Sequence, residues 1–507
     1  MNTGIGTYPR RRATVRPDAV ALEFEGASVT AAELSARVTR LANALRARGA
    51  GHGDRVAFLG FNHPALLETF FATTLAGGIA VLINPRLSAR EVGFIVGDAG
   101  ASVLVYGREQ AGTAATLAQG DAELKLIAVE AEDGPGERYE DVLAGAAEDA
   151  VDVDVADDDV ALLMYTSGTT GHPKGAMLTH RNLTFQFLNA FTGTDMRQDE
   201  VMLAMAPLFH IAGLNMTTLP TFLMGGRIII QRGFDAGTVL ATIATEGVTG
   251  SFLVPSMLDA LAQHPDFEST DLSSLRSVMV GGSPLPERSI RTWQARGVKV
   301  VQGFGMTETC PGVCVLEAKD ALEHAGTAGR PHVFSEVRVV DPTTGQDVPD
   351  GTAGEVWVRG PQVMKGYWNR PDATAAALAE GWYHTGDIAV RDAEGYFTIK
   401  DRIKDMYISG GENVYPAEVE NALLDVPGVL EAAVIGVPDE RWGESGRAFV
   451  VLTPGHSEDP ASLREALGER LARYKLPREV VISEALPRTT TGKIQKNVLR
   501  TQDVPTS

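Results

Sequence analysis

The sequence predicts an α/β protein: a large layered N-terminal domain with mostly parallel sheets, followed by a small α+β C-terminal domain. The chain has 507 residues, which is too long for a single hydrophobic core. Residues 1–110 alternate strand-like and helix-like segments, a pattern typical of parallel βαβ units. The last stretch has the mixed pattern and the length, roughly 100 residues, of an independent module. We therefore expect one domain over residues 1–403 and a second over residues 404–507.

The alternation of the first domain can be followed along the chain. Residues 31–46 carry apolar side chains at helical spacing, and residues 64–75 are expected to form the next helix. Residues 112–158 are rich in Ala, Gly, Glu and Asp, and we expect peripheral helix and loop there. Short apolar runs predict strands at 20–24, 28–30, 55–59, 78–83, 160–164, 202–206, 277–280, 298–301, 354–359 and 395–400.

A loop rich in glycine and hydroxyl groups, residues 165–175, follows the apolar run 160–164. Glycines let its backbone N–H groups approach a ligand closely, and Lys174 adds a positive charge, so the loop suits a polyphosphate. It is not a Walker loop, because Pro173 and Gly175 flank the lysine. A flexible linker is the alternative, but a patterned helix follows, with Thr179 as its cap and Leu183, Phe187, Leu188 and Phe191 on one face.

Composition excludes several classes of function. The net charge is −20, from 45 basic and 65 scattered acidic residues, which disfavours a nucleic-acid or anionic-membrane surface. No run of about 18 apolar residues is present, and no hydrophobic segment follows the basic residues 10–12. Cys310 and Cys314 are expected to be reduced core side chains rather than a disulfide or zinc site. We therefore expect a cytoplasmic protein.

Three further segments carry candidate ligand contacts. His210 lies in the apolar segment 207–213, where a lone histidine is more often a packed core residue than a catalyst. Gly282 and Ser283 follow a strand, and paired glycines permit a flat ring to lie against the backbone. In segment 302–308, Phe304 can stack on a base, while Thr307 and Glu308 suit an α-phosphate and Mg²⁺. Taken alone, Phe304 would be core filler and Glu308 an exposed loop carboxylate.

The second half of the chain adds two more candidates. Asp387 is expected at a glycine-framed turn, where its carboxylate can accept both hydroxyls of a ribose. Near the C-terminus, a turn with three threonines and a glycine presents Lys493. Between them, Pro416 opens a helix, strands are expected at 432–437 and 448–452, and a helix capped at Asp459 and Pro460 runs to Tyr474.

In this order the segments resemble the signatures of adenylate-forming enzymes, the superfamily of acyl-CoA synthetases, nonribosomal adenylation domains and luciferases, and most closely acyl- or aryl-CoA synthetases. The resemblance covers nearly the whole chain; Phe304 stands where the family usually has tyrosine, so a phenol hydrogen bond is absent. It implies nucleotide contacts from Thr166, Ser167, Gly168, Thr169, Thr170, Lys174, Gly282, Ser283, Phe304, Gly305, Met306, Thr307, Asp387 and Arg402, and Mg²⁺ at Glu308 and Thr166.

The resemblance also implies a two-step reaction with ATP, Mg²⁺ and coenzyme A. Lys493 would bridge the substrate carboxylate and the α-phosphate, and His210 would gate the carboxylate, giving an acyl-adenylate and pyrophosphate. Rotation at a hinge, Lys404, would then bring the turn with Gly410 and Gly411 to the adenylate for attack by coenzyme A. The expected catalytic residues are Lys493, Glu308, Thr166 and His210.

The substrate is expected to be an apolar monocarboxylate, either an aryl or phenylpropenoid acid or a medium-chain fatty acid. The expected wall of its pocket is mostly apolar, which disfavours a dicarboxylate that needs a basic partner. We expect a monomer or homodimer. The wall residues are Phe209, His210, Leu214, Gly303, Met306, Pro311 and Val313.

Other functions stay open to different degrees. A nonribosomal adenylation domain would need an acid near the wall for an α-ammonium group, and Glu308 alone is near; no carrier domain is expected after residue 507. An acyl-AMP ligase would carry an extra segment, and none is evident between residues 387 and 404. Luciferase chemistry, or nitrite activation for diazotising an aryl amine, would share the same motifs. An inactive nucleotide sensor would have lost the charged residues that are present here.

Overall fold

The computed structural model describes residues 3–166, 173–283, 285–402, 405–409, 412–439, 442–468, 470–471, 473–489 and 493–501. The chain forms two compact units: Met1–Val337 with Val358–Tyr383 (unit 1), and Arg338–Trp357 with His384–Ser507 (unit 2). The predicted fold class, a layered α/β domain with mostly parallel sheets plus a smaller C-terminal domain, is confirmed. The predicted boundary at 403/404 stays a prediction, because both residues lie outside the described ranges.

One sheet of unit 1 carries the strands around the glycine-rich loop. Its strand order within the described residues is β19-β9-β8-β4-β3-β5-β6-β7, and β8, β4, β3, β5, β6 and β7 run parallel. The strands are β3 (Arg55–Leu59), β4 (Ile79–Ile83), β5 (Ala101–Gly107), β6 (Lys125–Val129), β7 (Glu137–Arg138), β8 (Val160–Thr166), β9 (Lys174–Thr179) and β19 (Gly366–Tyr367).

A second sheet of unit 1 has the order β16-β15-β14-β13-β12-β10-β11-β1-β2. The strands from β1 to β14 along this order run parallel, and the antiparallel pairs lie at the two edges. The strands are β1 (Val20–Phe24), β2 (Ala27–Thr30), β10 (Val201–Ala204), β11 (Arg227–Ile230), β12 (Gly250–Leu253), β13 (Ser277–Gly281), β14 (Lys299–Gly305), β15 (Gly312–Leu316) and β16 (Arg330–Pro331).

Two smaller sheets complete the described strands. In the third sheet, the order is β17-β18-β21-β20, with β22 paired to β21; in the fourth it is β24-β23-β26-β25, with β27 paired to β26. The strands are β17 (Glu336–Val340), β18 (Ala353–Arg359), β20 (Leu378–Ala379), β21 (Trp382–Arg391), β22 (Phe397–Arg402), β23 (Tyr407–Ser409), β24 (Glu412–Val414), β25 (Val429–Asp439), β26 (Gly443–Leu452) and β27 (Glu479–Ile482).

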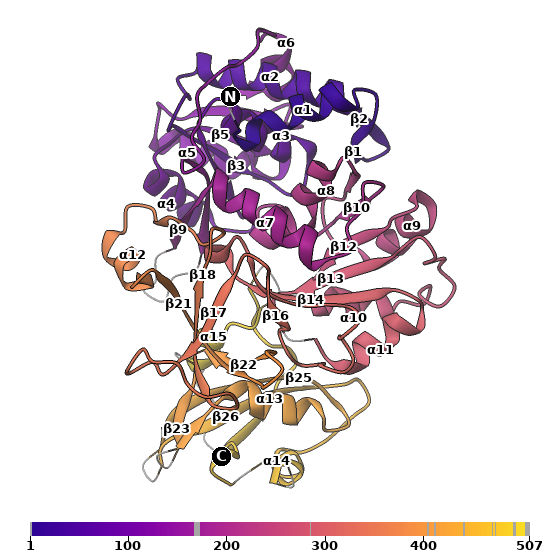
Figure 1. Cartoon of the computed structure of the whole chain (residues 1–507), viewed down its shortest axis with the longest axis vertical. Helices are drawn as coiled ribbons and strands as arrows, with labels where there is room; N and C mark the ends of the chain where they lie inside the picture. The colour runs from indigo at the N-terminus through magenta and orange to yellow at the C-terminus, as the bar shows by residue number, and fades with distance from the viewer. Residues whose placement is uncertain are drawn as a thin grey trace. The chain divides into compact units, whose positions relative to one another are not determined.

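Helices cover the faces of the sheets (Figure 1). Helices α4 and α5 pack on the β8-containing sheet, and α9, α10 and α11 pack on the second sheet around the fully buried Trp293. The helices are α1 (Tyr8–Val15), α2 (Ala31–Ala47), α3 (Pro64–Leu75), α4 (Ala89–Ala99), α5 (Ala111–Gly120), α6 (Tyr139–Ala144), α7 (His180–Gly193), α8 (Leu219–Met224), α9 (Ala236–Glu246), α10 (Pro255–Ala262), α11 (Glu287–Ala295), α12 (Pro371–Ala377), α13 (Pro416–Leu424), α14 (Pro460–Gly468) and α15 (Lys496–Arg500).

Three predictions, about segment 112–158 and two helices, were wrong. Segment 112–158 contains β6, a buried strand whose four apolar residues are too short a run to stand out against acidic surroundings. Leu188 of α7 is 37% exposed, because it stands one residue beyond the buried Phe187 and so turns toward solvent. The helix predicted to reach Tyr474 ends at Gly468, a residue with low helix propensity.

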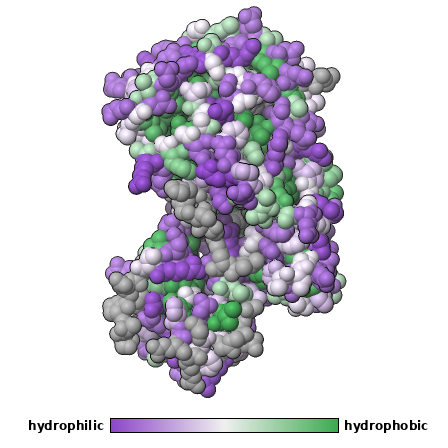
Figure 2. Space-filling model, turned by 90° about the vertical axis from the view of Figure 1, so that its left-hand side faces the viewer, coloured by the Kyte–Doolittle hydropathy of each residue, from purple (hydrophilic) through white to green (hydrophobic). Residues whose placement is uncertain are grey.

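The surface of the chain agrees with its composition. Hydrophilic residues are spread over the face shown in Figure 2, and hydrophobic residues occur there in small separate groups. In the described ranges, no helix combines the length and the hydropathy that crossing a bilayer requires.

Candidate active site

The predicted site residues divide into described and undescribed sets. Seven of them lie outside the described residues: Ser167, Gly168, Thr169, Thr170, Lys404, Gly410 and Gly411.

The two ends of the glycine-rich loop are held by an antiparallel strand pair. β8 leads into the loop and β9 leaves it, and Thr166 stands opposite Lys174 in their register. The phenol of Tyr165 donates a 2.8 Å hydrogen bond to Asp98, and its ring lies where a Cβ on Gly175 would come within 3.0 Å. The strand β9, which separates the loop from α7, was not predicted. The pairing fixes where Thr166 and Lys174 emerge beside the loop.

Glu308 comes to this loop from the other sheet of unit 1. It follows β14 in a single 3-10 turn and is 8% exposed. The hydroxyl of Thr166 lies 3.5 Å from Glu308 Oε1, although 142 positions separate the two residues. The phenol of Tyr367 donates a 2.8 Å hydrogen bond to the same oxygen. The structure therefore brings together two residues that the sequence predicts for one metal site, and adds Tyr367, which the sequence analysis missed.

The segment that precedes Glu308 is shaped by a tight strand connection. β14 pairs antiparallel with β15, and Phe304 stands opposite Cys314. Gly305 is required here, because a Cβ on it would lie 1.6 Å from the Pro311 carbonyl oxygen. Phe304, Gly305 and Met306 are half-buried, Thr307 is buried, and Gly282 and Ser283 at the end of β13 are exposed. These residues keep backbone and a ring accessible, as the predicted adenine contacts require.

The predicted acyl wall comes from two segments that are tied together. Leu214 and Val313 are fully buried, and Phe209 is buried. The side-chain amide of Asn215 donates a 2.7 Å hydrogen bond to the Cys310 carbonyl, which joins the π-helical turn Gly213–Thr218 to the β14–β15 connection. Pro311 and Met306 belong to this connection. Met216, which a Cβ on Gly303 would meet at 3.5 Å, is a neighbour that the sequence analysis missed.

His210 stands at the start of this turn. It is half-buried, and its Nδ1 accepts a 3.4 Å hydrogen bond from the Ala212 N–H.

The two cysteines, Cys310 and Cys314, are free and buried, and burial raises the pKa of each thiol. The prediction that both are core side chains is confirmed, and their reduced state stays a prediction.

In unit 2, Asp387 and Arg402 form one pair. They face each other in the β21–β22 register, and Arg402 Nε lies 3.0 Å from Asp387 Oδ1. Asp387 is 4% exposed. It lies within β21 rather than at a glycine-framed turn, so that expectation was wrong. Gly386 beside it has a φ of 71°, but the strand continues on both sides, and Ile388 and Ala389 are buried. The two predicted ribose contacts are nevertheless side by side.

Replacing Asp387 with asparagine is expected to raise the KM for ATP. A hydrogen bond to a charged group contributes about 1.5–3 kcal/mol, so the expected rise is roughly tenfold to a hundredfold. The reaction rate at saturating ATP should change less. Steady-state kinetics over a range of ATP concentrations will measure both quantities, and an unchanged KM would argue against the ribose role.

Lys493 lies in unit 2 and pairs with Thr489. Thr489 N–H donates to the Lys493 carbonyl at 2.7 Å, and Lys493 N–H donates to the Thr489 hydroxyl at 3.1 Å. Next to this pair, Arg488 and Ile494 form an antiparallel bridge. Lys493 itself is exposed. Backbone hydrogen bonds therefore hold Lys493 beside Thr489, with its side chain exposed.

The donors at Glu308 fit Mg²⁺ better than a softer metal. A carboxylate and a hydroxyl are hard oxygen donors, and Mg²⁺ is usually held by one or two carboxylates together with substrate phosphates and waters. In the described part of the chain, no cluster of three His, Cys, Asp or Glu side chains could cage a metal. The site therefore suits a magnesium ion that arrives with a nucleotide.

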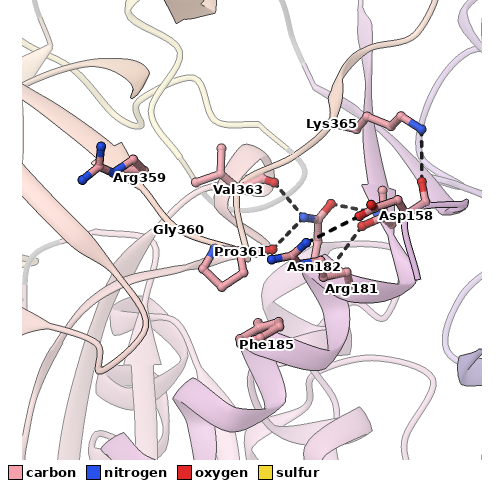
Figure 3. Close-up of a pocket in the computed structure, with 10 residues that line it drawn as sticks. Asp158, Arg181, Asn182, Phe185, Arg359, Gly360, Pro361, Val363 and Lys365 are labelled. Carbon is pink, nitrogen blue, oxygen red and sulfur yellow. Dashed lines mark hydrogen bonds and ion pairs between the residues drawn. The ribbon is translucent and has the colours of Figure 1, made fainter. Parts of the chain in front are cut away.

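A separate surface pocket of about 700 Å³ lies at the start of α7 (Figure 3). Arg181, Arg359 and Lys365 line it, but each already has a partner in the structure: Arg181 lies 4.0 Å from Asp158, Lys365 donates to the Asp158 carbonyl, and Arg359 pairs with Glu336. Asn182 bridges its wall by donating to the carbonyls of residues 361 and 363. None of the predicted site residues lines this pocket, and we assign it no ligand.

Comparison with known proteins identifies the family. The AMP-binding enzyme family matches residues 9–368, and the AMP-binding enzyme C-terminal domain matches residues 418–493. A feruloyl-CoA synthase from an Amycolatopsis species is 50% identical over 98% of this chain and 99% of its own length. A long-chain-fatty-acid–CoA ligase from Mycobacterium tuberculosis is 42% identical over 98% of each chain.

A solved structure agrees with these relatives. The o-succinylbenzoate coenzyme A synthetase from Bacillus subtilis, in complex with ATP and magnesium ion, superposes with a TM-score of 0.87 at 32% identity, over 97% of this chain and 99% of its own. The predicted resemblance is confirmed. The chain therefore belongs to the AMP-binding enzyme family and is an acid–thiol ligase within it.

Proposed function

We propose that this ligase activates a phenylpropenoid acid of the ferulate type with ATP and transfers it to coenzyme A. The observation that carries the proposal is the full-length 50% identity to a feruloyl-CoA synthase. The convergence of Thr166 and Glu308 beside the glycine-rich loop supports the ATP-dependent step. A medium- or long-chain fatty acid is the second candidate, supported by the relative that acts on long-chain fatty acids.

The first half-reaction joins two anions. The substrate carboxylate attacks an α-phosphorus that is already negative, so the site must offset the repulsion and the charge that grows in the transition state. Lys174 at the base of the loop and Lys493 supply positive charge in this proposal, and Asp387 with Arg402 holds the ribose. Glu308 and Thr166 would hold Mg²⁺, which supplies further charge neutralisation at the phosphates when bound. The products are an acyl-adenylate and pyrophosphate.

In the second half-reaction the carboxylate is already part of the acyl-adenylate, so the positive charge of Lys493 is not needed beside it. The thiol of coenzyme A attacks the acyl carbon, a thioester forms, and AMP leaves. We propose that the C-terminal region turns at Lys404 between the two steps, so that the turn around residues 410 and 411 replaces Lys493 at the adenylate. Excluding water between the steps protects the mixed anhydride from hydrolysis.

The substrate preference is argued from the buried wall. Leu214, Val313 and Phe209 are apolar and buried, and Met216 lies close to Gly303. A wall of this kind favours an apolar acid over a dicarboxylate. The two buried cysteines, which form no disulfide with each other, suit the cytoplasm, which is where we place the enzyme. We propose a monomer or a homodimer.

A panel of carboxylic acids will test the proposal. Ferulate and its close relatives are expected to give at least tenfold higher kcat/KM than octanoate, palmitate or succinate, with AMP release dependent on coenzyme A. The measurement follows AMP by chromatography with and without coenzyme A, and adding nitrite with an aryl amine tests the diazotisation alternative. ADP as the product, or full turnover without the thiol, would contradict ligase chemistry. A fatty acid as the best substrate would favour the second candidate.

A further inference from the structure

Tyr367 is held against the candidate metal site by its backbone. It lies in β19, which pairs with β9, and it stands opposite Ala176 in the register. Its N–H donates a 2.8 Å hydrogen bond to the hydroxyl of Thr374. Gly366 has a φ of 143°, and a Cβ there would lie 2.6 Å from Thr374 Cγ2, so the approach of this strand depends on glycine. The backbone of Tyr367, from which the phenol extends, is therefore fixed.

The side chain of Tyr367 contacts two predicted site residues. Its hydroxyl donates a 2.8 Å hydrogen bond to Glu308 Oε1, and the ammonium of Lys174 lies over its ring, 5.3 Å from the ring centre. The Met364 N–H also donates to the Glu308 backbone carbonyl at 2.8 Å. Segment 364–367 therefore binds both the backbone and the side chain of Glu308. One residue thus connects the acidic candidate with the lysine at the base of the loop.

The hydrogen bonds to Glu308 are unevenly distributed between its oxygens. Tyr367 and Thr166 both approach Oε1, and no described side chain donates a hydrogen bond to Oε2. A carboxylate that is held by one oxygen cannot rotate freely, and its other oxygen keeps its lone pairs for a cation.

We propose that Tyr367 is a positioning residue that orients Glu308 for Mg²⁺ binding and supports the Lys174 ammonium beside the phosphates. The inference rests on the proposed role of Glu308 in the adenylation step. Tyr367 itself takes no part in bond making. Its contribution is to keep the carboxylate in one orientation before the metal–nucleotide complex arrives.

The test measures metal binding directly. Mn²⁺ is titrated, with electron paramagnetic resonance detection, into the full-length protein containing a non-cleavable ATP analogue, and the signal of nucleotide without protein is subtracted. Tyr367→Phe removes only the donor oxygen. Because loss of an outer partner of a metal ligand usually lowers metal affinity by about 10- to 100-fold, we expect a rise of at least tenfold in the Kd for Mn²⁺. The Mg²⁺ concentration for half-maximal pyrophosphate exchange should rise in parallel.

Tyr139→Phe is the matched control. Its phenol makes a similar 2.7 Å hydrogen bond to a buried carboxylate, Glu68, among α2, α3 and α6. This change is expected to lower the melting temperature and leave the Kd for Mn²⁺ within twofold. A general effect of losing a buried phenol would instead move both variants alike, and that result would overturn the positioning role.

Glu308→Gln separates failure of this inference from failure of the proposed function. If Glu308→Gln weakens Mn²⁺ binding and Tyr367→Phe does not, the role of Tyr367 is wrong and that of Glu308 stands. If neither weakens it, the metal role of Glu308 fails as well. In the Glu308→Gln background, adding Tyr367→Phe should change the Kd less than twofold. Should Tyr367→Phe not purify as folded protein, Tyr367→His is compared in the same way, and an unchanged Kd again overturns the inference.

Discussion

Replacing Lys493 with alanine is expected to lower the rate of adenylate formation by two to three decades. Removing one charged group that stabilises a developing anion costs about 3–4 kcal/mol of barrier, which corresponds to that loss of rate. The measurement is ATP–pyrophosphate exchange with the best acid of the panel. The rate of thioester formation from a preformed acyl-adenylate should remain within a few fold of the rate of the unmodified enzyme. In that step no anion attacks the phosphorus, so the positive charge of Lys493 is not needed.

Lys319→Ala serves as the control for Lys493. Lys319 is an exposed lysine of unit 1, 3.0 Å from Glu317, and its replacement removes the same charge away from the predicted site. Its exchange rate should match that of the parent enzyme. Undiminished exchange in Lys493→Ala, or an equal loss in both half-reactions, would remove the lysine from its proposed role.

Replacing Glu308 with glutamine is expected to lower the adenylation rate by about two decades at a fixed Mg²⁺ concentration. The amide keeps the shape of the side chain and its contact with Tyr367 but loses the negative charge that attracts the cation. Raising the Mg²⁺ concentration should restore part of the rate, because the substitution lowers the affinity of the enzyme for the metal–nucleotide complex. Pyrophosphate exchange measured across a Mg²⁺ series will separate the two effects.

The control for this change is Glu317→Gln. Glu317 is a half-exposed carboxylate shortly after β15, paired with Lys319. It undergoes the same chemical change outside the predicted site, and its Mg²⁺ dependence should not move. If Glu308→Gln behaved like this control, Glu308 would be a structural carboxylate of the 3-10 turn.

The site could be predicted from the sequence only where its residues sit in short recognisable segments. Glu308 and Phe304 share one such segment, and Lys174 belongs to another, so glycine spacing and residue type were enough to propose them. Asp387 was also proposed, but its predicted setting was wrong, because the glycine on its N-terminal side suggested a turn where the chain continues as a strand. Arg402 is its strand partner, a relation that appears only in the register.

Tyr367 shows why the remaining part was beyond sequence reasoning. It stands 59 positions after Glu308, in a two-residue strand that carries no periodicity. A conspicuous signal was available, the Gly366–Tyr367 pair after β18, but a glycine beside an aromatic residue has many structural uses. Met216 was missed for the same reason, since its apolar side chain is indistinguishable from core until Gly303 is placed beside it.

The sequence by itself determined the α/β class, most strand positions and the family, and it supplied the candidate residues for ATP binding, because these depend on local periodicity and on motifs within a few residues. Only the tertiary structure decided which carboxylate oxygen of Glu308 is held, that Thr166 and Tyr367 share it, and that Asp387 and Arg402 are partners. The physical reason is that hydrogen bonds and ion pairs act over about 3 Å, whereas these residues are separated by long stretches of chain whose path is set by sheet register and packing.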